Sequence, residues 1–195
     1  MEQRLGLLAV VLRRVEEGQR AEGGAGVNEV RIRPGGPADT AAVLAMFDSA
    51  VAWLAAAGRT GQWGSDPFTG NPKRTSQVAA WAAGGGLRVA EVGGEPAACI
   101  VVGAAHDYVP AATEPELYVQ GLVTDRRFAG HGAGRALLDW AAGEARERDA
   151  GLLRVDCYAG GDGRLVAYYE SCGFTRVAPF TVGEWPGMLL QRRLT

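Results

Sequence analysis

The pattern of apolar and polar residues along the chain predicts a mixture of helices and strands. Apolar side chains recur at helical spacing between Ala42 and Leu54, so we expect a helix that Asp39 or Thr40 caps and that ends near Gly58. Further helices are expected over residues 75–83, from the glycines near 134 to about 148, and over 164–172. Short apolar or alternating runs predict strands at residues 30–33, 87–92, 97–104, 116–124, 152–158, 174–177 and 188–192.

The order of these elements indicates the fold class. Gly93 and Gly94 are typical of a tight hairpin turn between two of the strands. A helix separates the strands at 116–124 and 152–158, and such a crossover usually joins parallel strands. The sequence therefore predicts an α/β fold with a mixed sheet flanked by helices.

The N-terminal residues form a separate unit in this interpretation. Leu5, Leu8, Leu12 and Val15 have helical spacing, and the stretch that follows, at 21–28, is rich in glycine and alanine. We therefore expect a helical extension and linker over residues 1–28, followed by one folded domain over 29–195.

Composition narrows the class of protein. The chain has 195 residues, 47% of them hydrophobic, and a net charge of −2, which is typical of one globular domain with a sizeable core. The apolar run at 5–12 is much shorter than the roughly 20 residues that cross a bilayer, so no membrane partner is expected. Lys73 is the only lysine and the charge is nearly balanced, so we expect no nucleic-acid partner.

The cysteines indicate a cytoplasmic protein without a metal site. Cys99, Cys157 and Cys172 are odd in number, lack metal-ligand spacing, and lie in or beside apolar runs. Buried, reduced thiols are the usual state of such cysteines in the cytoplasm.

Three alternating glycines form the most informative motif. Gly130, Gly132 and Gly134 lie where a loop becomes an apolar helix. Glycine lets the backbone approach a ligand closely, and the first N–H groups of a helix are free to bind an anion. This segment is therefore predicted to bind phosphate groups.

Two other phosphate-binding motifs fit less well. Arg135 and Ala136 stand where a P-loop needs lysine and then serine or threonine, which excludes that motif. A dinucleotide fingerprint has a strand before its glycines and an acid such as Asp156 after the next strand. Here, however, the third glycine comes one residue early, residues 124–128 separate strand from glycines, and only about 60 residues follow.

Two signatures instead resemble the GNAT superfamily of acyl-CoA-dependent N-acyltransferases, over about residues 30–194. Residues 122–138 (Leu-Val-Thr-Asp-Arg-Arg-Phe-Ala-Gly-His-Gly-Ala-Gly-Arg-Ala-Leu-Leu) resemble the family's strand, turn and diphosphate loop. Residues 169–174 (Tyr-Glu-Ser-Cys-Gly-Phe) match its Tyr-x-x-x-Gly-Phe. Ala129 and Asp162 depart from the family's usual Arg or Gln and Asn, respectively.

The resemblance implies a splayed mixed sheet and acetyl-CoA as cofactor. The strand before the loop would pair its backbone with the pantetheine arm, and the loop would hold the diphosphate. A bulge near Gly121 would free an N–H for the thioester carbonyl, although tight packing would also explain this glycine. The implied cofactor-binding residues are Leu122, Val123, Thr124, Ala129, Gly130, His131, Gly132, Ala133, Gly134, Arg135 and Asp162. Arg126 and Arg127 are further candidates for the phosphates.

Acetyl transfer to an amine needs one group that gives a proton and one that accepts it. By resemblance, Tyr169 gives a proton to the thiolate, which a phenol can do at neutral pH. Strand alternation places Glu116, Tyr118 and Gln120 on one face, so Glu116 or Tyr118 is a candidate base, directly or through water. His106 is an alternative base, and His131 is a candidate phosphate ligand.

The acceptor would contact the loop before the second helix. Gln62, Trp63 and Phe68 lie in the segment that lines the acceptor side in similar proteins, although the aromatic rings could also fill the core. The expected activity is transfer of an acetyl group from acetyl-CoA to a primary amine of a small molecule or peptide. A non-catalytic acyl-CoA-binding sensor on the same fold is the alternative. The resemblance allows a homodimer, but no residue here argues for one.

Overall fold

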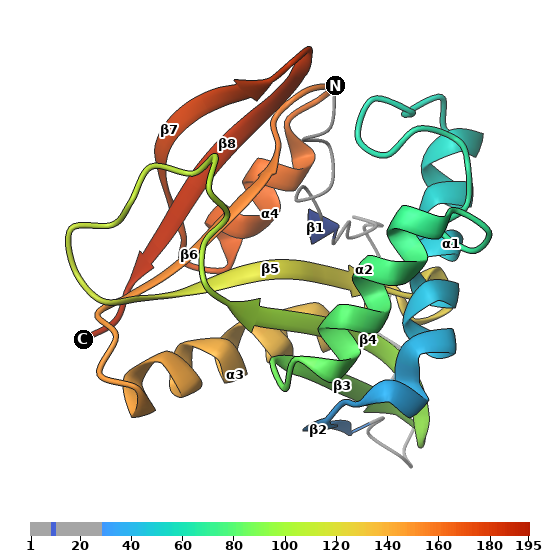
Figure 1. Cartoon of the computed structure of the whole chain (residues 1–195), viewed down its shortest axis with the longest axis horizontal. Coiled ribbons are helices and arrows are strands. Elements are labelled where there is room, and N and C mark those ends of the chain that lie inside the picture. Colours follow the sequence, from blue (N-terminus) through green and yellow to red (C-terminus); the bar gives the residue numbers. More distant parts are fainter. Residues whose placement is uncertain (1–8, 11–28) are drawn as a thin grey trace, which may run out of the picture.

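The computed structural model describes Ala9–Val10 and residues 29–195, which form one mixed sheet with helices on both faces (Figure 1). The strands lie in the order β2-β3-β4-β5-β6-β8-β7, and β1 pairs with β5 outside this path. The strands are β1 (Ala9–Val10), β2 (Val30–Pro34), β3 (Leu87–Val92), β4 (Glu95–Gly103), β5 (Glu116–Thr124), β6 (Leu152–Tyr158), β7 (Thr175–Val182) and β8 (Trp185–Arg193). The helices are α1 (Thr40–Ala56), α2 (Pro72–Ala83), α3 (Ala133–Glu147) and α4 (Arg164–Ser171), with short 3-10 turns η1 (Pro37–Asp39) and η2 (Arg126–Phe128).

The elements expected from the sequence are all present from Val30 onward, with some different ends. Helix α2 begins at Pro72 rather than at residue 75, because the Asn71 side chain caps it by accepting bonds from the amides of Lys73 and Arg74. β7 and β8 are longer than expected because they pair along a hairpin that reaches Val182 and Trp185. The exposed side chains and the proline of β7 hide this length from a search for alternation.

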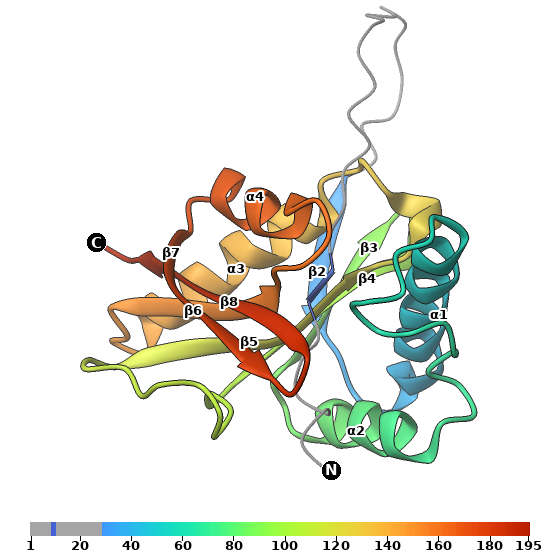
Figure 2. The same ribbon diagram turned by 90° about the horizontal axis from the view of Figure 1, so that it is seen from above.

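Different helices cover the two faces of the sheet, and each face has its own core (Figure 2 shows the helices). Helices α1 and α2 cover one face, where Phe47, Trp81 and Val123 belong to a buried apolar cluster. Helices α3 and α4 cover the other face, where Leu137, Tyr169 and Leu122 belong to a second cluster. Residues Pro37–Ala56 are long and apolar enough to cross a membrane by composition. Seven side chains of α1 are nevertheless buried in the first cluster, as expected of a core helix.

The sheet separates between β5 and β6. These parallel strands pair only from Glu116–Val119 to Leu152–Val155, although both continue for several residues. On its other side β5 pairs with β4 up to Thr124, with a bulge that leaves Gln120 without a partner residue. The resemblance predicts a bulge near Gly121, and the observed bulge lies one residue before this glycine. The splayed mixed sheet is also confirmed.

Strand β1 lies in the gap that this separation leaves. Ala9 and Val10 pair in parallel with Leu122 and Val123 of β5. Because β4 takes the opposite edge of β5, β1 must use the edge that faces β6. These two residues are strand rather than helix, and the rest of the extension expected over 1–28 lies outside the described residues.

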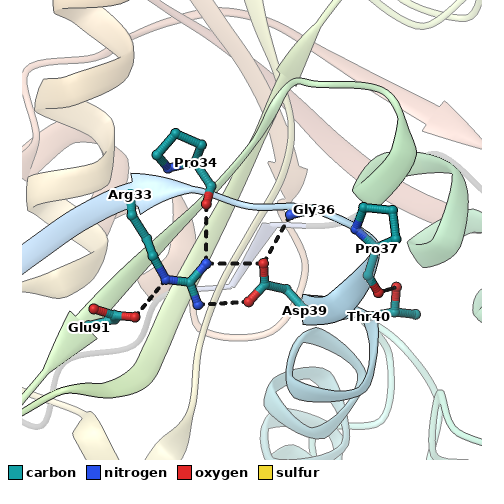
Figure 3. A network of polar contacts seen from close by, with 7 residues as sticks. All are labelled: Arg33, Pro34, Gly36, Pro37, Asp39, Thr40 and Glu91. Atoms are coloured by element: carbon teal, nitrogen blue, oxygen red, sulfur yellow. Dashed lines mark hydrogen bonds and ion pairs between the residues drawn. The ribbon is translucent and has the colours of Figure 1, made fainter.

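A polar network fixes the start of α1 against the sheet (Figure 3). The guanidinium of Arg33 on β2 donates two hydrogen bonds to the Asp39 carboxylate, at 2.7 and 3.0 Å, and one to Glu91 on β3 at 2.6 Å. Asp39 also accepts from the Gly36 amide, and the Arg33 bonds hold the pKa of Asp39 below its ordinary value. This network joins the turn before α1 to the two outer strands.

Candidate active site

The glycine loop between η2 and α3 leaves several amides free. Gly130 and Gly132 have φ of +91° and +80°, which side chains with a Cβ rarely adopt. Among the described residues, no backbone carbonyl accepts a bond from the amides of Ala133, Gly134 or Arg135, which are the first three of α3. A Cβ at either glycine would meet no atom within 4 Å. The loop therefore presents free N–H groups to open space, as a diphosphate requires.

A cavity of about 60 Å³ lies in front of this loop. Its lining includes Thr124, Arg126, Arg135 and the loop glycines. Arg126 stacks over Trp53, with its guanidinium carbon 4.0 Å from the ring centre, and burial lowers its pKa. Arg135 lies beside the helix end and donates to the Ser171 carbonyl at 2.6 Å. Both guanidinium groups are placed to add positive charge where the helix amides already favour an anion.

Two buried hydroxyl groups have no hydrogen-bond partner among the described residues. They belong to Thr124, which lines the small cavity, and to Tyr169 of α4, whose side chain is fully buried. A buried hydroxyl without a partner is costly, so such groups often await a ligand. The pKa of Tyr169 is raised well above its ordinary value, mainly by burial and to a smaller extent by the nearby Cys157 and Tyr168. The phenol therefore stays protonated, as a proton donor must.

A buried carboxylate on β6 lies close to the separation of the strands. Asp156 is 4% exposed and accepts a hydrogen bond from the Tyr118 hydroxyl and weaker ones, at 3.4 Å, from Tyr108. Burial raises the pKa of Asp156 to about 6, while the two phenol bonds act in the opposite direction. Burial and Asp156 together raise the pKa of Tyr118, so its hydroxyl is a donor and not a base at neutral pH.

The other candidates for the base have different surroundings. Glu116 lies on the same face of β5 as Tyr118, as alternation predicts, and its carboxylate forms an ion pair with the buried Arg154 at 2.9 Å. His106 stacks on Tyr108 and touches the edge of Tyr118. Burial lowers the pKa of His106, and its Nε2 has no partner among the described residues. Asp156 is thus the carboxylate that accepts hydrogen bonds from both Tyr118 and Tyr108.

A larger cavity, of about 520 Å³, lies on the α1–α2 side of the sheet. The loop before α2 contributes Gln62, Trp63 and Phe68, so the three acceptor residues expected from the sequence do meet in one pocket. Tyr158 and Trp185 add aromatic walls from β6 and β8, and the Trp185 indole donates to the Gln62 carbonyl at 3.1 Å. The hydroxyl of Tyr158 sits against Gly61, where a Cβ would come within 2.2 Å of it.

Comparison with protein-family profiles identifies the family to which this fold and candidate site belong. The profile described as the acetyltransferase (GNAT) family matches residues 56–174, more than half of the chain. The chain belongs to the GNAT family. This confirms the resemblance, and acetyl-CoA is the cofactor of that family. No curated protein sequence is significantly similar to the chain.

Solved structures with the same GNAT fold are only distantly similar in sequence. A GNAT-family acetyltransferase from Listeria monocytogenes 4b F2365 is 22% identical with a TM-score of 0.65, covering 85% of this chain and 95% of the other. A putative phosphinothricin N-acetyltransferase is 23% identical with a TM-score of 0.64, covering 86% and 99%. The putative acetyltransferase yncA from Salmonella typhimurium, solved with acetyl-CoA, is 20% identical with a TM-score of 0.59, covering 85% and 94%.

Some cofactor candidates of this GNAT chain lie apart from the small cavity. Asp162 lines a separate cavity of about 190 Å³, where it forms ion pairs with Arg59 at 3.0 Å and Arg164 at 2.8 Å. His131 is exposed, and its Nδ1 lies 3.2 Å from the Phe128 carbonyl. Arg127 forms ion pairs with Asp125 and Glu95. Their predicted contacts with the cofactor stay predictions.

Sequence reasoning missed three residues that matter in this GNAT site: Asp156, Tyr158 and Arg74. The sequence motifs suggest only a ribose-binding role for Asp156, although its place on the same strand face as Tyr158 follows from alternation. Arg74 was hidden by the late start assigned to α2. The Asn-Pro pair at residues 71–72 is the signal that would have found it.

Proposed function

We propose that the protein transfers the acetyl group of acetyl-CoA to the primary amine of a small molecule or peptide. The observation that carries this proposal is the combination of free amides at the glycine loop with the buried, unpartnered hydroxyl of Tyr169 on α4. When bound, acetyl-CoA supplies a thioester whose carbonyl carbon an amine can attack.

In this proposal the glycine loop and its arginines hold the diphosphate. The free amides at the start of α3 donate to phosphate oxygens, and Arg126 and Arg135 neutralise their charge. The edge of β5 at Leu122 and Val123, which pairs with β1 in this structure, would offer its backbone groups to the pantetheine arm once β1 has left it. Because these are main-chain contacts, the alanine at 129 removes only a side-chain contact.

The proton steps fall to two buried residues, Asp156 on β6 and Tyr169 on α4. Asp156 is a better candidate base than Tyr118 or Glu116. Its carboxylate is largely ionised above pH 6, whereas the Tyr118 hydroxyl is a donor to Asp156 and the Glu116 carboxylate is held in an ion pair with Arg154. Tyr158, two residues further along the same strand face, lines the large cavity, so Asp156 lies about 7 Å from it along the strand. Tyr169 gives its proton to the departing thiolate.

An amine panel tests the proposal. Purified protein with acetyl-CoA would be given amino acids, polyamines, aminoglycosides and peptides, with free thiol and acetylated product both measured. We expect amine-dependent thiol release that saturates with acetyl-CoA. Saturable binding of CoA with no product from any amine would favour the non-catalytic sensor instead.

A further inference from the structure

The large cavity has the size and composition of a small-molecule site. Its volume of about 520 Å³ lies within the usual 300–1,000 Å³, and its walls combine aromatic side chains, such as Trp63 and Trp185, with polar ones. Among the described residues, Arg74 is the one positively charged side chain in its lining, with the carboxylates of Asp66 and Glu184 exposed beside it. The chemistry of the ligand therefore depends on what this guanidinium does.

The Arg74 guanidinium is held rigidly in the cavity wall. It lies over the Phe68 ring, 4.3 Å from the ring centre, and donates to the carbonyls of Asp66 at 3.0 Å and Trp63 at 2.7 Å. A guanidinium has five N–H donors, and bonds to the described residues use two of them. In the part of the chain that the structure describes, no carboxylate forms an ion pair with Arg74.

The charge of Arg74 is poorly compensated. Burial lowers its pKa, and the carboxylates of Asp66 and Asp48 only oppose this effect from a distance. The Asp48 carboxylate already accepts bonds from the amides of Phe68 and Thr69. Arginine nevertheless stays charged, and a partly buried charge without an anionic partner is costly. An anionic ligand group would lower this cost, whereas a polycationic ligand would raise it.

We propose that Arg74 binds the carboxylate of the acceptor, so that the protein acetylates free amino acids. This inference rests on the proposed function, because it assumes that the large cavity takes the amine. The planar donor fork of Arg74 suits a carboxylate, and the rings of Trp63 and Trp185 offer a surface for the amino-acid side chain. A peptide N-terminus or a polyamine lacks the adjacent carboxylate.

Matched pairs of acceptors test the assignment. Each free amino acid would be compared with its carboxamide, which keeps the amine and the side chain but loses the negative charge. We expect kcat/KM at least tenfold higher for the acid with the wild-type protein, and no preference with Arg74→Gln. Arg74→Lys keeps the charge without the fork and should retain part of the preference.

Arg88→Gln is a matched control. Arg88 also stacks on an aromatic ring, that of Trp140 at 4.7 Å, and donates to backbone carbonyls, but it lies outside the cavity. It should leave the preference for acids unchanged. The proposal would be wrong if the wild-type protein used carboxamides or diamines as well as acids, or if Arg74→Gln slowed both members of a pair equally. If Arg74→Gln fails to fold, the wild-type pairs and Arg74→Lys still decide.

A binding measurement separates this proposal from the proposed function. Calorimetry would compare N-acetyl amino acids with their N-acetyl amides, and this needs no turnover. Arg74-dependent binding of the acids, with no acetylation of any amine, would refute the proposed acetyltransferase activity but support carboxylate binding by Arg74. Acetylation of amines, with equal binding of acids and amides, would support the acetyltransferase activity but refute carboxylate binding by Arg74.

Discussion

Removing one oxygen atom from Tyr169 should make the protein more stable and less active. The Tyr169 hydroxyl is fully buried and has no partner among the described residues. Leaving such a group unsatisfied costs ~1–3 kcal/mol, and Tyr169→Phe removes the group without changing the ring. For a domain of this size, 1 kcal/mol corresponds to about 2–4 °C in the melting temperature. We therefore expect a rise of at least about 2 °C.

The same change should slow acetyl transfer. A positioned proton donor contributes about 10²–10⁴-fold to a rate, so kcat should fall about 100-fold or more in Tyr169→Phe. The free amides of the glycine loop are untouched, so the affinity for CoA should remain. Thermal unfolding, calorimetry with CoA and initial rates of thiol release measure these three effects on one sample.

Tyr118→Phe is the control with the opposite sign of stability. The Tyr118 hydroxyl is also buried, but it donates to the Asp156 carboxylate, and a bond to a charged group contributes ~1.5–3 kcal/mol. The melting temperature should therefore fall in this variant. A fall in Tyr169→Phe as well would show that the Tyr169 hydroxyl has a partner in the free protein. An unchanged kcat in Tyr169→Phe would remove it from the mechanism.

Three further predictions concern the base, the loop and the extension. Since burial raises the pKa of Asp156 from 3.8 to about 6, its ionisation should cost ~3 kcal/mol, so unfolding free energy should fall as pH rises from 4 to 6. Asp156→Asn should remove this dependence and also the rise of kcat/KM near pH 6; a persisting rise would assign the base elsewhere. Gly132→Ala strains a φ of +80° by ~1–2 kcal/mol and should weaken CoA binding in calorimetry, whereas unchanged affinity would exclude the loop. Deleting residues 1–28 should tighten CoA binding, because β1 pairs with the edge of β5 that pantetheine would use; an unchanged Kd would count against this competition.

The parts of the site that the sequence predicts are those built from neighbouring residues. The loop Gly130–Gly132–Gly134 needs only its glycines and the helix that follows, and both signals are contiguous. Tyr169 was located by the short pattern that ends in Gly173 and Phe174. Such motifs fix local backbone geometry, which does not depend on how distant strands align.

The missing parts depend on the register between distant segments. Tyr118 reaches Asp156 because parallel pairing sets Tyr118 opposite Arg154, 36 positions later in the chain, and nothing local encodes that alignment. The bulge at Gln120 is likewise a property of two strands, and it ends the simple alternation that placed Glu116, Tyr118 and Gln120 together. The hydrophobic pattern predicts that a strand exists, but the register in which it pairs with its neighbour depends on the whole fold.

The separation of β5 and β6 explains why proton acceptor and proton donor can lie so close and yet differ in protonation. Just beyond the last paired residue of β6, Val155, Asp156 accepts hydrogen bonds from Tyr118 and Tyr108, which keep its pKa lower than burial alone would allow. The Tyr169 hydroxyl has no such partner among the described residues, and burial together with the nearby Cys157 and Tyr168 keeps its pKa high. Near neutral pH the carboxylate is therefore charged while the phenol is neutral, which is the combination that an amine attacking a thioester requires.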